Sequence, residues 1–576
     1  MNFKRLLKAS LQEEPCDLLF KNAKIANLFT MEFEKAEVAV KDGIIVGIGS
    51  GYQAAETVDC EGMVLSPGFI EGHMHIESTC MTPRNCAAAL APHGTTTAMP
   101  DPHEIANTCG PEGVRYMHRE SEGLPVDFFF GAPSCVPASS HETPLEPIEA
   151  QGIKELLSDG TCTHLGEMMN FPGVIFGDEA VWKKLETAAE AEKVITGHAP
   201  GLSGPQLSAY LLGGVSSDHE CGTLEEAREK LRRGMYLMIR QGATARNLST
   251  LAPLLAEKPE LACRILAVSD DITPDFILQR GELDGCLREL IACGVPPLAA
   301  LRTITLTPAE YFRLYDRGAI APGRKADLVL LESLEKGHVK KVWKEGRLVA
   351  VDGTLTVPLP ERETKLPGRG TAVRTPEAEE LKLKLPQAEV RVNIIENLPG
   401  SVMTGTLTEP PTVRDGCAVA DAERGLAKMC VVEKNRGTGK FALGFVKNFG
   451  LKKGAIASSV AHDAHNYTCA GMDDQSMAAA LARLAEIRGG IVIAEGEKIL
   501  AELELPAGGL MSLLPHLELC GKFSELYRAV KELGCENDHA FMQLAFLSLS
   551  VIPELKLTDQ GYCDIRKRDK VPLFVL

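Results

Sequence analysis

The stretch MVLSPGFIEGHMHIES, residues 63–78, decides the fold of this chain. Its first half, Met63–Ile70, is a short apolar run of the kind that forms a buried strand. His73 and His75 follow the run, and because they are two residues apart their side chains leave the strand on the same face. Two imidazoles on one face can hold a divalent metal ion, and in a (β/α)8 barrel such groups belong at the C-terminal ends of the strands. The stretch therefore predicts a metal site at the mouth of a barrel.

Seven further apolar runs follow, separated by amphipathic stretches such as EEAREKLRRG. They are Thr95–Pro100, Val126–Gly131, Thr163–Met168, Lys193–His198, Gly214–His219, Met235–Arg240 and Arg264–Ser269. Strand-like runs that alternate with helical connectors indicate βα units and a parallel sheet. Eight units within residues 63–308 fit the size of a (β/α)8 barrel. An open, doubly wound sheet is the alternative.

The flanking segments complete the predicted architecture. Residues 1–62 and 309–360 share short β-rich runs, including a hairpin signal at Lys41-Asp42-Gly43, and we expect them to form one small domain split by the barrel. Residues 361–385, rich in Pro, Glu and Lys, read as a linker. Residues 386–576 alternate strand and helix patterns. The sequence thus predicts an α/β protein: a (β/α)8 TIM-type barrel, a small split β-sandwich domain and an additional α+β C-terminal domain.

Composition excludes several classes of protein. The formal net charge of -17 argues against nucleic acid as a partner, because phosphate binding needs clustered basic residues. The N-terminus lacks the pattern of a signal peptide, and no apolar run is long enough to predict a membrane span. The 17 cysteines contain no CxxC pair, so we expect reduced thiols and a cytoplasmic location.

Other strand ends supply further candidate ligands. Glu167 follows in GEMMN, His198 in GHAPG, His219 in SSDHE and Asp270 in AVSDD. Together with the first histidine pair, these four His and two carboxylates are enough for two metal ions bridged by one carboxylate. Such ions lower the pKa of bound water to about 7 and so supply hydroxide at neutral pH. Asp270, beside that hydroxide, is our candidate for the general base.

These motifs resemble those of the amidohydrolase superfamily and, within it, of the bacterial adenine deaminase family. The matching stretches are GFIEGHMHIESTCMTP, DPHEIANTCG, GEMMNFPGV, GHAPGLSG, MIRQGATARNL, VSDD, VAHDAHN and FLSLSVIPELKLTDQG. They extend over nearly the whole chain. Many binuclear amidohydrolases bridge their metals with a carboxylated lysine, whereas this chain has Glu167 there, which suits the adenine deaminase pattern.

The resemblance implies hydrolysis of adenine to hypoxanthine and ammonia, a reaction of purine salvage. It implies Mn²⁺ or Fe²⁺ as the metals, while the ligand set also accepts Zn²⁺. A hydroxide bridging the two ions would attack C6 of the purine, and Asp270 would accept its proton. N1 of the ring must also gain a proton. Glu104 in DPHEIAN is the first candidate donor and Glu77 the second. The alternative for Glu104 is a charge at the start of a helix that satisfies backbone N–H groups.

Several residues near the predicted site have more than one possible role. Arg240 could bind substrate or hold a carboxylate ligand, and His103 could line the pocket or extend the metal site. Asp271 could support a ligating histidine, or exchange roles with Asp270. In the C-terminal domain, SSVAHDAHN (residues 458–466) could close the pocket, bind another ion or form an ordinary loop. We assign its His465 to substrate binding.

Three other functions compete with adenine deamination. The nearest is a cyclic amidohydrolase of the dihydroorotase or hydantoinase type, against which Glu167 counts. The second is an N-acyl deacetylase on the same scaffold. The third, a non-catalytic assembly relative, would be expected to lose ligands that are intact here. We expect a small purine as the partner, no membrane, and a homo-oligomer.

Overall fold

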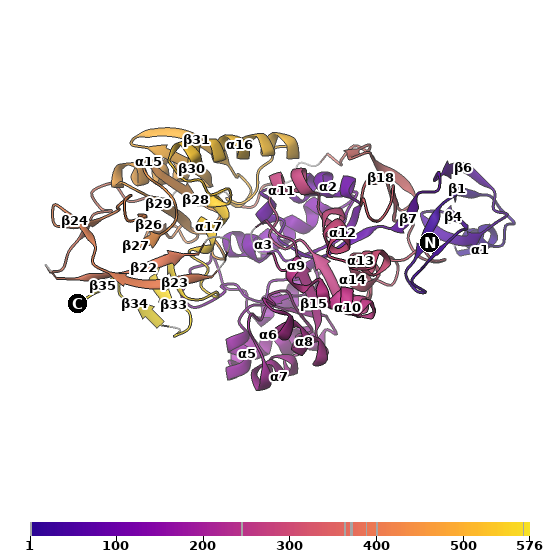
Figure 1. Cartoon of the computed structure of the whole chain (residues 1–576), viewed down its shortest axis with the longest axis horizontal. Coiled ribbons are helices and arrows are strands. Elements are labelled where there is room, and N and C mark those ends of the chain that lie inside the picture. Colours follow the sequence, from indigo (N-terminus) through magenta and orange to yellow (C-terminus); the bar gives the residue numbers. More distant parts are fainter. Residues whose placement is uncertain are drawn as a thin grey trace.

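The computed structural model describes residues 3–243, 246–361, 365–368, 373–387, 389–398, 401, 403–567 and 569–576. Figure 1 shows three regions along the long axis of the molecule. The N-terminal strands lie at one end, the central region carries helices around short strands, and the C-terminal sheet lies at the other end. The predicted metal ligands belong to the central region.

Two sheets form the N-terminal region. The first has the order β5-β4-β1-β6, with β1 Cys16–Lys21, β4 Glu37–Lys41, β5 Ile44–Gly49 and β6 Ala54–Asp59. The second has the order β20-β19-β18-β17-β7-β2-β3, with β2 Lys24–Asn27, β3 Glu32–Glu34, β7 Val64–Pro67, β17 Leu328–Leu331, β18 Val339–Lys344, β19 Arg347–Val351 and β20 Thr354–Leu355. Because β17 pairs with β7, segments on both sides of the central region share one sheet. Asp42 and Gly43 connect β4 to β5 with φ of 48° and 77°, the conformation of a tight hairpin turn.

The central strands run parallel and follow chain order. They are β8 Phe69–Met74, β9 Thr95–Pro100, β10 Asp127–Phe128, β11 Phe130–Ala132, β12 Cys162–Met168, β13 Ile195–Gly197, β14 Ser217–Asp218, β15 Tyr236–Arg240 and β16 Ile265–Val268. They form three sheets, β8–β10, β11–β13 and β14–β16, and a parallel bridge between Met74 and Asp270 joins the ends of the first and last strands. The predicted mixed α/β class with parallel strands is confirmed. Within the described residues, however, the hydrogen-bonded ladder is not one closed ring.

The first predicted strand, Met63–Ile70, differs from the structure. Its Val64–Pro67 part is β7 in the N-terminal sheet, and the central strand β8 begins only at Phe69. Gly68 lies between them, where a Cβ would meet the Thr96 hydroxyl at 2.2 Å. The Pro67-Gly68 pair therefore passes the chain from one sheet to the next, because only glycine allows the close approach.

A buried carboxylate holds the first and last central strands together. Glu71 in β8 accepts the backbone N–H of His73 with one oxygen and that of Ser269, directly after β16, with the other, both at 2.9 Å. Burial and the neighbouring Glu282 raise the pKa of Glu71 well above its usual range. His73 is thus tied through Glu71 to the chain directly before Asp270.

Helices connect the central strands and cover them (Figure 1). After α1 Phe3–Ser10 in the N-terminal region, they are α2 Pro83–Leu90, α3 His103–Ser121, α4 Ala150–Ser158, α5 Phe171–Phe176, α6 Glu179–Glu190, α7 Gly204–Leu212, α8 Leu224–Arg232, α9 Leu248–Leu251, α10 Pro253–Glu257, α11 Pro274–Arg280, α12 Leu283–Ala292, α13 Pro297–Thr303 and α14 Leu306–Tyr311. Their buried residues are mainly apolar, as expected of amphipathic helices against a core.

The C-terminal region is built on a nine-stranded sheet in which β23-β22-β27-β26-β29-β28-β30-β31 are neighbours and β35 pairs with β22. Its strands are β22 Arg391–Asn397, β23 Thr404–Glu409, β26 Leu426–Val432, β27 Phe441–Lys447, β28 Ala455–Ser458, β29 Tyr467–Gly471, β30 Gly490–Glu495, β31 Lys498–Glu504 and β35 Phe574–Val575. Two small sheets comprise β21 Leu383–Lys384, β24 Thr412–Arg414 and β25 Cys417–Val419, and β32 Leu555–Thr558, β33 Gly561–Asp564 and β34 Asp569–Val571. The helices are α15 Asp474–Glu486, α16 His516–Glu532 and α17 Ala540–Phe546.

Of the predicted linker 361–385, residues 362–364 and 369–372 lie outside the described part, and the domain boundaries stay a prediction. In the described residues, no helix has both the length and the apolar character needed to cross a membrane. All 17 cysteines are present as free thiols.

Candidate metal centre

The six predicted ligands meet at one end of the central strands. His73 lies in β8 and His75 directly after it, and Glu167 lies in β12. His198, His219 and Asp270 each follow closely on a strand end. All six side chains are buried, and all but His73 line one cavity. The cavity is also lined by His103, Glu104, Met169, Glu220, Arg240, Asp271, His462, Asp463, Phe546, Leu549 and Ile552.

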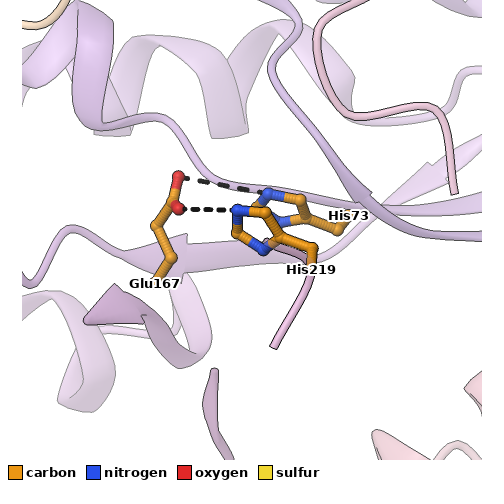
Figure 2. Close-up of side chains that lie close together, drawn as sticks. All are labelled: His73, Glu167 and His219. Atoms are coloured by element: carbon orange, nitrogen blue, oxygen red, sulfur yellow. Dashed lines mark ion pairs between the residues drawn. The ribbon is translucent and has the colours of Figure 1, made fainter. Parts of the chain in front are cut away.

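Glu167 lies between two groups of histidines. Its Oε1 is 3.4 Å from Nε2 of His75 and 4.0 Å from Nε2 of His73. Its Oε2 is 3.0 Å from Nδ1 of His198 and 3.2 Å from Nε2 of His219. Figure 2 shows each carboxylate oxygen facing a different ring of the stacked pair His73 and His219. Burial would raise the pKa of Glu167, but the surrounding histidines hold it well below its usual range. The carboxylate is therefore ionised and faces both groups.

The histidine hydrogen bonds suit a metal. Nδ1 of His75 lies 3.1 Å from the carbonyl oxygen of Asp101, which can only accept, so Nδ1 carries the proton and Nε2 presents a lone pair. Nε2 of His73 has no hydrogen-bond partner among the described residues although it is buried. A buried nitrogen left without a partner is costly, and a metal ion would satisfy it. The donor set of imidazoles and carboxylates thus fits divalent transition ions.

Asp270 occupies a constrained position beside the first pair of histidines. Its Oδ1 lies 3.4 Å from Nε2 of His73 and 3.2 Å from Nε2 of His75. Its backbone has a φ of 59°, uncommon for a residue with a side chain, and its N–H donates to the carbonyl of His73 at 3.0 Å. Arg240 donates to Oδ2 at 2.6 Å. Burial would raise the pKa of Asp270, but Arg240 and the histidines hold it well below its usual range.

Glu220 is a member of the site that sequence reasoning missed. Its Oε1 lies 3.5 Å from Nε2 of His219 and 3.7 Å from Nδ1 of His198. Arg240 donates to both Glu220 and Asp270 and so links the two metal-ligand groups. The geometry therefore favours a role for Arg240 in holding these carboxylates over a role in binding substrate. The available signal was that Glu220 directly follows His219 in SSDHE.

The two candidate acids are placed differently. Glu104, near the start of α3, lines the cavity, and burial raises the pKa of its carboxyl. Glu77 does not line the cavity; its Oε1 accepts the N–H of Ile105 at 3.1 Å. Burial and the nearby Glu104 raise the pKa of Glu77 to about 8. His103 lines the cavity with Nδ1 3.3 Å from Asp101 and 3.7 Å from Glu167, so it borders the metal-ligand groups.

The C-terminal region closes the cavity from the other side. His462 and Asp463, from the loop between β28 and β29, form part of its wall, as do Phe546, Leu549 and Ile552 at and after the end of α17. The loop thus reaches the pocket, one of the three possibilities considered for it. His465 is not part of that wall; it is fully buried behind Glu104, which does not favour a contact with substrate. Asp271 is in the wall and accepts the hydroxyl hydrogen of Ser78.

A buried ion pair supports His198 and His219 from behind. Lys230 in α8 donates to Asp218 at 2.9 Å and to the carbonyl of Ala199 at 2.7 Å, and both charged side chains are fully buried. Asp218 also accepts the N–H of Ala199 at 2.7 Å. The pair therefore fixes the backbone next to both histidines.

Replacing Lys230 by Met should lower the free energy of unfolding by about 3–5 kcal/mol, because Asp218 would be left buried without its cation. Urea denaturation followed by circular dichroism measures the change. The double variant Lys230→Met/Asp218→Asn is the control and should recover part of the loss. A Lys230→Met protein as stable as the unchanged chain would contradict the supporting role.

Parallel strands with histidines and carboxylates at one end are typical of metal-dependent hydrolases of the amidohydrolase class, and the pattern of the "Amidohydrolase family" matches residues 64–349. A second pattern, "Adenine deaminase C-terminal domain", matches residues 401–569. The chain is 42% identical over 570 residues to the "Adenine deaminase" of Desulfatibacillum aliphaticivorans, with 99% of each chain covered. It is also 42% identical over 574 residues to "Adenine deaminase 2" of Carboxydothermus hydrogenoformans, again with 99% of each covered. The chain belongs to the adenine deaminase family.

Among solved structures, that of an enamidase is similar with a TM-score of 0.46 and 16% identity, covering 60% of this chain and 98% of the other. The resemblance drawn from the motifs is confirmed by the full-length relatives. The chain is accordingly a hydrolase acting on C–N bonds, and its amidohydrolase region implies a divalent metal. The described residues contain several groups that could hold such an ion.

Proposed function

We propose that this protein hydrolyses adenine to hypoxanthine and ammonia. The observation that carries the proposal is the position of Glu167, whose two oxygens face two separate groups of histidines. This arrangement occurs in a chain that is similar over its full length to proteins named adenine deaminase.

Two divalent ions, when bound, would supply a hydroxide nucleophile at neutral pH. We assign His73, His75 and Asp270 to one ion, His198 and His219 to the other, and Glu167 to both. Glu220 is close enough to the second group to complete it. The ligand set accepts manganese or iron, and zinc as well. Arg240 and the neighbouring histidines keep the pKa of Asp270 low, so its carboxylate is ionised and free to take up a proton.

The purine would lie between the metal-ligand groups and the wall formed by the C-terminal region. Phe546, Leu549 and Ile552 give that wall an apolar surface, suited to the face of a heterocycle. A larger cavity of about 730 Å³ shares Met169, Glu220, Arg240 and Ile552 with the metal-centre cavity. We infer that substrate enters and product leaves through this opening.

Glu104 is the residue we assign to N1 of the ring. The hydroxyl of Ser78 lies 3.3 Å from Glu104 Oε1 and also contacts Asp271. Since that hydroxyl hydrogen is used on Asp271, its oxygen can accept a hydrogen from Glu104, which suits a protonated acid. Burial raises the pKa of Glu104 and favours the same state.

The Glu104→Gln variant should lose about 10²-fold or more in kcat, because an amide can donate a hydrogen bond to N1 but cannot transfer a proton. In the unchanged protein the acid must be protonated. Activity should therefore fall as pH rises through the raised pKa of Glu104, and steady-state rates measured against pH test this. Glu77→Gln is the matched control and should lose less; the reverse order of effects would assign proton donation to Glu77.

Purified protein supplied with Mn²⁺ should convert adenine to hypoxanthine, seen as an ultraviolet change together with release of ammonia. Dihydroorotate and hydantoin serve as competing substrates. If adenine were inert while a cyclic amide was opened, the proposal would be wrong and the cyclic amidohydrolase alternative would stand. Metal analysis of the active protein would identify the preferred ion.

A further inference from the structure

Two histidines of the C-terminal region contact Glu104 from behind. Nδ1 of His462 lies 3.3 Å from Oε1 of Glu104, and Nε2 of His465 lies 3.6 Å from Oε2. All three side chains are buried. Glu104 belongs to α3 of the central region, whereas both histidines belong to the loop between β28 and β29. The C-terminal region thus supplies the immediate neighbours of the assigned acid.

His465 is held in one tautomer. Its Nδ1 accepts the backbone N–H of Ala461 at 3.0 Å, so in the neutral ring the proton is on Nε2, facing Glu104. Glu104, His462 and His465 are close enough together to hold a metal ion. A histidine that binds a metal through one ring nitrogen donates a hydrogen bond from the other, as Nδ1 of His75 does. Nδ1 of His465 accepts a hydrogen bond, so His465 does not fit a metal ligand. His465 therefore points a fixed N–H toward Glu104 at 3.6 Å, longer than a hydrogen bond, and cannot pass a proton from one nitrogen to the other.

His462 is arranged differently. One of its nitrogens faces Glu104, and the other, Nε2, has no hydrogen-bond partner among the described residues. Its ring stacks on Phe546 with centroids 4.9 Å apart, which fixes its plane. The ring lines both the metal-centre cavity and a second, smaller cavity behind the loop. His462 and His465 thus both lie between Glu104 and that smaller cavity, but only His462 also lines the metal-centre cavity.

The smaller cavity is lined mainly by polar side chains and has the half-buried Asp559 in its wall. Its volume of about 10 Å³ has room for about one water molecule, and its lining includes Glu142, Thr468 and Asp559. Oε2 of Glu142 and Oγ1 of Thr468 are buried with no partner among the described residues. Asp559 is half-buried, and Gln560 next to it is exposed. Burial and the nearby Asp463 raise the pKa of Glu142 to about 8, so this carboxyl can carry a proton near neutral pH.

Deamination uses both hydrogens of one water molecule, one for N1 and one for the departing ammonia. Glu104 gives its proton to N1 in every turnover and must regain one before the next. The proton released by the next water that enters balances the one that returns. A separate proton route from solvent to Glu104 would allow Glu104 to be reprotonated without using the opening through which substrate and product pass.

We propose that His462 returns protons to Glu104 from the polar cavity lined by Glu142 and Asp559, while His465 positions the other oxygen of Glu104. The inference rests on the proposed function, because it assigns the step that follows proton transfer to N1. His462 passes protons by taking one up at one nitrogen and releasing one at the other. The C-terminal region is then part of the reaction and not only a cover over the pocket.

The test is the His462→Ala variant with adenine as substrate. We expect kcat to fall at least about tenfold, with a much smaller fall in kcat/KM, because proton return follows the product-forming steps. Imidazole added to the buffer should restore kcat by replacing the lost ring. His462→Gln, which keeps more of the side-chain volume, should show the same selective loss if the alanine variant folds poorly. Thermal unfolding and metal content of each variant establish that the fold and the centre are intact.

Two controls separate the outcomes. His338→Ala, an exposed histidine near the N-terminal sheets, should keep full activity, and imidazole should not stimulate it. His465→Ala should lower kcat and kcat/KM together, without rescue. Parallel losses in His462→Ala without rescue, or no loss at all, would overturn the inference while leaving the proposed function standing. Failure of the unchanged protein to deaminate adenine would instead refute the proposed function.

Discussion

The Asp270→Asn variant is expected to deaminate adenine about 10²–10⁴-fold more slowly than the unchanged protein, because asparagine cannot accept the proton of the nucleophile. The amide oxygen can still face His73 and His75, as Oδ1 does now. The amide NH₂ would take the place of Oδ2, and it cannot accept the hydrogen bond that Arg240 donates there. Most of the bound metal should remain, because the histidines and Glu167 are unchanged. Steady-state kinetics and metal analysis of the same preparation measure both quantities.

Asp271→Asn is the matched control, since the two aspartates are neighbours but Asp271 contacts Ser78 instead of the histidines. It should lose less activity than Asp270→Asn. Full activity in Asp270→Asn would exclude the assigned proton role. A larger loss in Asp271→Asn would show that the two neighbouring residues have exchanged roles.

The second large effect is expected for Glu167→Gln, which should bind about one metal ion per chain in place of about two and lose more than about 100-fold in kcat. The physical reason is that a carboxylate offers an anionic oxygen to each group of histidines. An amide offers one neutral oxygen, and its NH₂ faces the other group as a donor. Metal analysis by mass spectrometry and adenine turnover measure the two effects.

Glu190→Gln, at the exposed end of α6, is the control for loss of a carboxylate far from the centre and should leave both quantities unchanged. If Glu167→Gln retained both ions and full turnover, the bridging assignment would be wrong. Retention of both ions with lost turnover would place the role of Glu167 in catalysis and not in holding the metals.

The sequence allowed the meeting of the six candidate ligands to be predicted, because each lies at or just after the end of an apolar run. The period of a strand places His73 and His75 on one face, and parallel strands bring their carboxyl ends to one edge. Glu220 was not predicted as a site residue because neighbouring side chains on a strand point to opposite faces. A residue next to His219 is therefore expected to point away from the metal site. The structure ends β14 at Asp218, and beyond the strand this alternation no longer applies.

The wall supplied by the C-terminal region could not be placed from sequence. His462 and Asp463 are far along the chain from Glu104, and no local pattern states which surface of one region packs on another. The division of Met63–Ile70 between two sheets could have been predicted from the sequence, because Pro67 and Gly68 interrupt the apolar run. We predicted one strand because the apolar residues of this run are nearly continuous. Hydrophobic periodicity does not indicate which sheet a strand joins.

Glu71 has a consequence for the order in which the protein is made. It joins β8 to a backbone N–H that lies 198 residues later in the chain. At roughly 5–20 residues per second, a ribosome needs about 10–40 s to synthesise that interval. Throughout that time the histidine pair exists without Asp270. On the proposed ligand assignment, the complete metal centre can therefore form only after translation has passed the last central strand.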